Sequence, residues 1–161
     1  MRSTARIQIA APIDAVWTIV ADPSRALSYM SGVTRWEVVS DDPTGLGARY
    51  RMLLRVGSAE VGGLIEVVEF DPPNDLAWTS VTGVDQRGRF RLRTERNGRT
   101  RVELRLAYGV AGSGVFGVVA ERIAAPIVGG HLRRSVQQLK RLVEYEQLRA
   151  RAAERRAARA T

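Results

Sequence analysis

Residues 115–147 read VFGVVAERIAAPIVGGHLRRSVQQLKRLVEYEQ, which is the longest helical pattern in the chain. At 100° per residue, four apolar side chains fall within about 40° of Leu132 and form a continuous stripe. They are Val128, Val136, Leu139 and Val143. Arginine, glutamine and glutamate side chains occupy the opposite side. An amphipathic helix of this length must lie against a large apolar surface, and a curved sheet is the natural partner.

Proline and glycine interrupt this helical pattern in its first half. Pro126 removes a helix hydrogen bond, and Gly129 and Gly130 each lower helix stability by about 1 kcal/mol. We therefore expect a helix in two pieces, with a front segment at 115–125 and a long rear segment at 127–147.

Seven other segments alternate apolar and polar residues with a period of two, which predicts β-strands. They are residues 2–10, 33–40, 48–56, 59–70, 76–82, 88–95 and 100–108. Helical spacing after Pro12, and again from Ser24 to Tyr29, predicts two short helices between the first two strands. Short turns, including Asn97-Gly98, favour an antiparallel meander. The sequence therefore predicts an α+β fold in which the long C-terminal helix covers one face of a seven-stranded sheet.

The composition excludes several kinds of site. The chain of 161 residues has the size of one domain and no cysteine, which excludes disulfides, thiolate zinc sites and thiol catalysis. His131 is the only histidine, so a Ser-His-Asp arrangement would have to use it and no site can contain two. No metal or nucleotide motif is present, so no cofactor is implied. No apolar leader and no stretch of ~18 apolar residues occurs, and we expect a soluble, cytoplasmic protein.

The chain is strongly basic, with 25 arginine and lysine residues against 17 acidic ones and a formal net charge of +8. All but Lys140 are arginine, which is typical of a GC-rich, actinobacterial-type genome. Half of the excess lies in 147–161. We expect a domain over 1–147 and a basic tail over 148–161, a helical extension or disordered, with weak contact to anionic lipids as one possible role. Strand arginines alternate with glutamates and lack aromatic neighbours, which favours a salt-bridged surface over nucleic-acid binding.

Several short strings occur in the order found in one protein family. They are Ala11-Pro12 before Val16-Trp17, Ala21-Asp22-Pro23, Ser31-Gly32-Val33, Gly45-Leu46-Gly47-Ala48-Arg49-Tyr50, Val68-Glu69-Phe70-Asp71-Pro72-Pro73, Leu76-Ala77-Trp78, and, with Pro126, Leu139-Lys140-Arg141-Leu142. Together they cover residues 3–147 and resemble the polyketide cyclase/dehydrase and lipid-transport family of the START-like (SRPBCC) superfamily. The resemblance implies the helix-grip fold, a strongly curved antiparallel sheet wrapped around a long C-terminal helix.

The chain departs from the family pattern at two aromatic positions and in its tail. Tyr29 stands where many members carry tryptophan, and Trp36 stands where an aliphatic residue is commoner. Both keep an aromatic group near the expected cavity, and Trp36 would narrow it. The basic tail has no counterpart in the family pattern.

In this family, the space between sheet and helix is a cavity for hydrophobic small molecules such as lipids, quinones, sterols and polyketides. An apolar lining with a few polar tips is typical of such pockets. The residues expected to line it here are Tyr29, Trp36, Tyr50, Met52, Trp78, Phe90, Leu104, Leu106, Tyr108, Phe116, Val119, Ile123, Ile127 and His131. We expect its mouth between 115–125 and the loops at 28–32 and 57–63. The same pattern would equally describe a filled core.

Catalysis would need polar groups inside that space. Cyclases of the family steer a reactive polyketide by shape and move protons with a few polar side chains, and the candidates here are Tyr50, Tyr108, Glu66 and His131. His131 lies about 100° from the centre of the helix stripe, so a flanking role is the simpler interpretation. Glu66 would be a buried carboxylate with a raised pKa on an inner strand face, and merely solvated if Gly62-Gly63 shifts the pleat.

Three functions stay open on the sequence. The first is a carrier or sensor, not an enzyme, that encloses a lipid, quinone, sterol or polyketide-like molecule. The second is a cofactor-independent polyketide cyclase, aromatase or dehydratase. The third is a protein-interaction module such as one half of a toxin–antitoxin pair, because a fold does not fix a function. The oligomeric state is also open.

Overall fold

The structure is a computed structural model that describes residues 1–109 and 115–160, with the side chains of α3 described from residue 122 onward. Its elements are β1 (Arg2–Ile9), α1 (Ile13–Val20), the 3-10 turn η1 (Pro23–Arg25), α2 (Ala26–Tyr29), β2 (Val33–Val38), β3 (Arg49–Val56), β4 (Ala59–Asp71), β5 (Asp75–Ser80), β6 (Gln86–Thr94), β7 (Thr100–Tyr108) and α3 (Val115–Arg159). All seven predicted strands are present, and the short helices lie between β1 and β2 as expected.

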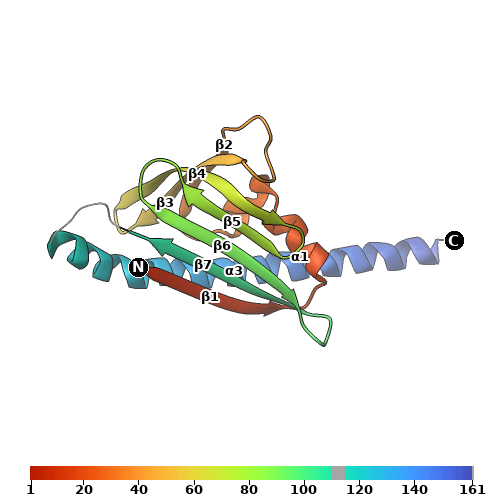
Figure 1. The fold of residues 1–161 in the computed structure, drawn as a ribbon. Coiled ribbons are helices and arrows are strands. Elements are labelled where there is room, and N and C mark those ends of the chain that lie inside the picture. The colour runs from red at the N-terminus through yellow and green to blue at the C-terminus, as the bar shows by residue number, and fades with distance from the viewer. Residues whose placement is uncertain (110–114, 161) are drawn as a thin grey trace.

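The seven strands form one antiparallel sheet in the order β1-β7-β6-β5-β4-β3-β2. The first strand returns beside the last, with Ile7 opposite Val102 and Ile9 opposite Thr100. Figure 1 shows the sheet curled over α3, which crosses beneath it and extends beyond it toward the C-terminus. This is the helix-grip fold that the sequence predicted.

The apolar stripe of α3 faces the sheet, as predicted. Its members are all at most 5% exposed: Val128, Leu132, Val136, Leu139 and Val143. They pack in one core with inward residues of the strands, among them Ile9 and Val102. Burial of each such side chain contributes about 1.5–3 kcal/mol, so the stripe is the main attachment of the helix to the sheet.

α3 is a single helix from Val115 to Arg159, so the prediction of two pieces separated at Pro126 is wrong. Pro126 is exposed, which leaves the lost hydrogen bond on the solvent side of the helix, where water can satisfy the carbonyl. Val128 and Leu132 are buried directly after it. Packing of the stripe therefore outweighs the local preferences of proline and glycine. The helix continues through the basic segment after residue 147 as far as Arg159.

Gly62 and Gly63 mark a close approach of backbones. A Cβ on Gly62 would lie 2.1 Å from the Met52 carbonyl oxygen, and a Cβ on Gly63 would lie 2.2 Å from the Thr82 carbonyl oxygen. The irregularity in the β4–β5 ladder lies further along, between Val67 and Glu69. The strand pair at this corner can therefore be made only with glycine.

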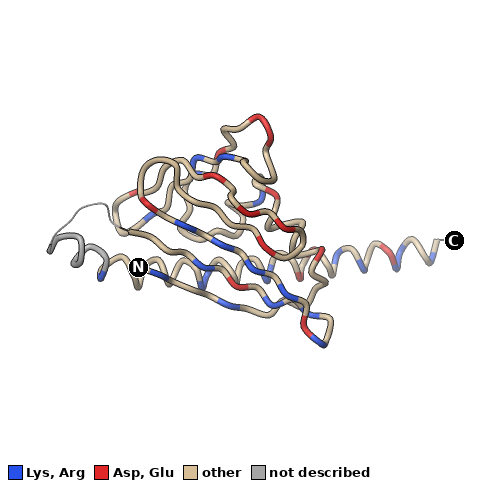
Figure 2. Tube along the Cα trace, viewed as in Figure 1, with Lys and Arg blue, Asp and Glu red and all other residues tan. Residues whose placement is uncertain are grey.

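The outer face of the sheet carries ion pairs, as the mixture of arginine and glutamate predicted. Figure 2 shows residues of both charges along the strands. Glu103 accepts from Arg6 and Arg105, each at 2.6 Å. Burial alone would raise the pKa of the Glu103 carboxyl, but the hydrogen bonds and charges of these two arginines outweigh it and lower the pKa. Asp75 pairs with Arg93 at 2.8 Å. This face is a salt-bridged surface.

Candidate functional site

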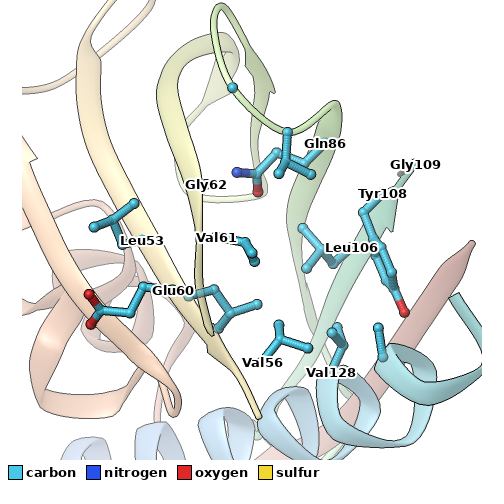
Figure 3. A pocket seen from close by; sticks show the side chains of 14 residues that line it. Leu53, Val56, Glu60, Val61, Gly62, Gln86, Leu106, Tyr108, Gly109 and Val128 are labelled. Atoms are coloured by element: carbon cyan, nitrogen blue, oxygen red, sulfur yellow. The ribbon is translucent and has the colours of Figure 1, made fainter. Parts of the chain in front are cut away.

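A cavity of about 600 Å³ lies where the β3–β4 hairpin, the start of β6 and the end of β7 meet α3. Figure 3 shows side chains from these elements around one space. Its lining is Leu53, Leu54, Val56, Glu60, Val61, Gly62, Gly83, Val84, Gln86, Leu106, Tyr108, Gly109, Ala124 and Val128. Its size and its mostly aliphatic wall are those of a site for a small apolar molecule.

Strand and helix periodicity place the wall of this cavity. Leu106 and Tyr108 are two residues apart on β7 and share its inner face. Val128 begins the buried stripe of α3, and Ala124, one helical turn earlier, continues it into the cavity wall. Gly62 on β4 and Gly83 in the loop between β5 and β6, which lie in close backbone contact and form the glycine corner, also belong to the wall. The cavity is thus the part of the sheet–helix interface that the stripe does not fill.

Among the side chains that the structure describes, three polar ones belong to the wall of the cavity: Glu60, Gln86 and Tyr108. Gln86 and Tyr108 are cross-strand partners on β6 and β7. The Tyr108 hydroxyl lies 3.6 Å from Met1 Sδ. Glu60 forms an ion pair with Arg55 at 3.5 Å, and its side chain is 44% exposed at the rim. Gln86 is only 7% exposed and sequence reasoning missed it, because a lone glutamine at the start of a strand carries no pattern of its own.

The aromatic residues predicted to line the cavity instead pack against one another next to it. Trp36 stacks on Tyr50 with 5.3 Å between ring centroids and meets Trp78 edge-on at 6.2 Å. Phe90 lies 6.1 Å from Trp78 and 6.2 Å from Tyr29. We call these five residues the aromatic cluster. The rings fill the space between sheet and helix at this end of the molecule.

A small void of about 20 Å³ lies between the aromatic cluster and the cavity. It has room for about one water molecule. Trp78 connects it to the cluster, and Leu54 and Leu106 belong to its wall and to that of the cavity. Of the predicted lining, Met52, Leu104 and His131 also border this void. The predicted strand residues therefore divide among the cluster, the void and the cavity, and Leu106 and Tyr108 are the ones among them that border the cavity itself.

The remaining predicted residues lie on α3. Phe116 and Val119 fall outside the described side chains. Ile123 is 62% exposed, and Ile127 is half-buried without bordering the cavity. The prediction treated 115–125 as a separate front segment. In the continuous helix, Ala124 lies one turn before Val128 and on the same face as the buried stripe, so Ala124 borders the cavity instead.

Gly88 makes the aromatic cluster possible and was not recognised from the sequence. It lies opposite Trp78 across the β5–β6 ladder. A Cβ on Gly88 would lie 2.0 Å from the indole ring, so the ring occupies the space that any other side chain would need. A lone glycine inside a strand pattern was the available signal for such a close approach.

The first catalytic candidate, Tyr50, is held in the aromatic cluster. Its hydroxyl donates a hydrogen bond to the Pro43 carbonyl oxygen at 2.7 Å, and its ring stacks on Trp36. Burial raises the pKa of the Tyr50 hydroxyl. The Tyr50 hydroxyl therefore stays protonated and donates its hydrogen bond to the protein backbone.

The second candidate, Glu66, lies on the outer face of the sheet. Its neighbours Ile65 and Val67 are buried, at 0% and 2% exposure, so the alternation turns Glu66 outward. It accepts a hydrogen bond from Arg49 Nε at 2.8 Å across the β3–β4 ladder. Of the two interpretations offered by the sequence, the structure shows the outward one.

The third candidate, His131, ties α3 to the loop before β2 and to the end of β3. Its Nε2 donates to the Arg55 carbonyl at 3.0 Å, and its Nδ1 accepts from Arg134 at 2.9 Å and lies 3.3 Å from Ser31 Oγ. A Cβ on Gly32 would lie 2.5 Å from the imidazole ring. Burial lowers the pKa of His131, and the charge of Arg134 lowers it further against the opposing effect of the Arg55 carbonyl.

The structure does not bring Tyr50, Glu66 and His131 together, and none of these three borders the cavity. The fourth candidate, Tyr108, is part of the cavity wall. Over the described residues, no cluster of three or more histidine and carboxylate side chains could hold a metal ion. In the same part of the chain, no helix is both long enough and apolar enough to cross a membrane.

A model of the family described as polyketide cyclase / dehydrase and lipid transport matches residues 1–144. The chain belongs to this family, as its strings and fold predicted. A search of curated proteins finds no match.

Solved structures share the fold at low sequence identity. Protein TTHA0849 from Thermus thermophilus is 23% identical with a TM-score of 0.78, over 91% of this chain and 99% of that one. The Zhui aromatase/cyclase from a Streptomyces species is 17% identical with a TM-score of 0.76, over 89% of this chain and 93% of that one. Protein Ms6760 from Mycobacterium smegmatis is 19% identical with a TM-score of 0.62, over 90% and 92%.

Proposed function

We propose that this protein binds a hydrophobic small molecule in the 600 Å³ cavity and acts as a carrier or sensor for it. The observation that supports this most is the cavity itself, because a filled core would leave no such space beside a closely packed aromatic cluster. The family includes lipid transport in its description, which agrees with an apolar cargo. The ligand contacts we propose are the aliphatic residues from β3, β4, β7 and α3 that form the wall.

A carrier explains the site better than a cyclase does. Acid–base catalysis needs titratable groups within hydrogen-bond reach of the reacting atoms. Tyr50 and His131 already have protein partners outside the cavity, and Glu66 faces solvent with Arg49. This leaves Tyr108 as the one candidate at the wall, without a second candidate beside it to exchange protons. Glu60 is the one carboxylate among the described residues of the wall, and it lies at the rim paired to Arg55.

A neutral fluorescent probe tests the proposal, with one variant that fills the cavity and one matched control. N-phenylnaphthylamine is titrated into wild-type protein, where saturable binding to one site is expected. Ala124→Trp places an indole in the wall and should weaken binding at least tenfold. Ala150→Trp makes the same change on an exposed turn of the same helix and should leave binding unchanged.

Saturable binding that Ala124→Trp abolishes would support the cavity as the site. Absence of binding to the wild-type protein, or equal binding by both variants, would overturn the proposed function. Organic extraction of the protein purified from its own host, followed by mass spectrometry, would then identify the natural ligand of a carrier.

A further inference from the structure

Gln86 is a largely buried polar residue whose side chain belongs to the cavity wall. Its backbone N–H donates to Ser80 Oγ at 3.1 Å, and its residue is 7% exposed. Among the described residues, its side-chain carboxamide has no hydrogen-bond partner. Figure 3 shows the carboxamide turned into the cavity, toward the strand that carries Gly62.

Gln86 lines the cavity, where water can hydrogen bond to its carboxamide, and a ligand that fills the cavity displaces that water. Leaving the buried amide without a partner would then cost about 1–3 kcal/mol of binding free energy. The opposite wall offers aliphatic side chains and the glycine corner, as Val61 and Gly62 illustrate. The partner of the carboxamide must therefore come from whatever occupies the cavity.

We propose that Gln86 determines ligand specificity by hydrogen bonding to a neutral oxygen of the bound molecule, a carbonyl or a hydroxyl. This inference rests on the proposed function and adds the residue and the ligand group to it. A primary amide can donate two hydrogen bonds and accept others, so it fits a ketone, a quinone oxygen or an alcohol.

The charges around the cavity exclude an anionic ligand group at this position. No arginine or lysine belongs to the described residues of its wall, and the one carboxylate there, Glu60, is already paired with Arg55 at the rim, so the wall offers an anion no cationic partner. Burying a carboxylate without a cation partner costs far more than burying a carbonyl. The site therefore selects a molecule that is apolar over most of its length and carries one uncharged oxygen near the β6–β7 edge.

A matched pair of ligands measures this directly. Acetylnaphthalene and ethylnaphthalene share a carbon skeleton and differ only by a carbonyl in place of a methylene. Their affinities are measured by displacement of N-phenylnaphthylamine from wild-type protein and from Gln86→Met, which keeps the length of the side chain and removes the amide. Comparing the affinity ratio between the two proteins cancels the difference in hydrophobicity between the ligands.

We expect Gln86→Met to shift the ratio about tenfold toward ethylnaphthalene, the value of one good hydrogen bond. Gln86→Asn, which retracts the amide, should shift it less, and the exposed control Gln137→Met should not shift it. Thermal unfolding of each variant shows that it is folded. An unchanged ratio in a folded Gln86→Met that still binds both ligands would overturn the role of Gln86 and leave the carrier function intact. Failure of both ligands to bind wild-type protein would overturn the carrier function and this inference with it.

Discussion

The two ends of the sheet–helix interface are built from the same alternation of strand residues, yet one end is closed and the other is open. At the closed end, the five rings of the aromatic cluster form a continuous series of pairwise contacts, and glycine at position 88 makes room for one of them. At the open end, aliphatic side chains line a cavity of about 600 Å³. The comparison teaches that the volume of the inward side chains, and not the hydrophobic pattern, decides which part of the interface is a packed core and which part is a cavity.

The largest expected effect comes from truncating the closed end. Trp78→Ala removes a 2%-exposed indole from the centre of the cluster and should lower the free energy of unfolding by about 3–5 kcal/mol. Leu53 is half-buried in the cavity wall, so its side chain is packed on one side only. Leu53→Ala should therefore lower the free energy of unfolding by only about 1 kcal/mol. Urea denaturation of both variants measures the difference. Equal costs would mean that the two ends are packed alike.

The glycine corner, which lies beside the cavity, should come second. Gly62→Ala places a Cβ 2.1 Å from the Met52 carbonyl oxygen and should lower the free energy of unfolding by about 2–4 kcal/mol. Gly45→Ala is the control, because it has a positive φ of 92° but no atom within 4 Å of the added Cβ, and should cost only about 1 kcal/mol. A similar loss in both variants would show that φ alone, and not the close approach, requires glycine at position 62.

His131 should make stability depend on pH in a window of its own. Burial lowers its pKa in the folded protein below the ordinary value of 6.5, so the unfolded chain takes up the proton first as pH falls. The contribution of neutral His131 is therefore present above about pH 6.5 and is lost as pH falls through the lower folded pKa. Melting temperatures between pH 8 and pH 5 should fall for wild-type protein and fall less for His131→Gln. An identical slope in both would contradict this.

The outer face should give the smallest effect. Glu66 and Arg49 form an ion pair with side chains 30% and 47% exposed, and such pairs contribute little. Glu66→Gln should change the free energy of unfolding by about 0.5 kcal/mol or less and leave probe binding in the cavity unchanged. A large loss of binding would place Glu66 in the site after all.

The sequence predicted the fold well because strand alternation and the helix stripe are local patterns that tertiary packing reinforces. It predicted a break at Pro126 wrongly, because the cost of a proline on the solvent side of a helix is small beside the burial of Val128 and Leu132. It chose the inward strand residues correctly but could not tell a packed aromatic ring from a cavity wall. That distinction depends on how far the sheet curls and on close approaches such as Gly88 against Trp78. Gln86 belongs to no recognisable sequence pattern, and only its burial at the cavity wall in the structure identifies it as a candidate ligand contact.

Methyl-detected NMR during a titration with ethylnaphthalene tests the central claim most directly. The ring current of the ligand should shift the methyl signals of Leu53, Val56 and Val61 around the cavity. The methyl signals of Ile65 and Val67, which are fully buried on the strand beside the aromatic cluster, should stay in place. Shifts of equal size at both ends, or at neither, would contradict a molecule with one closed end and one ligand-binding end.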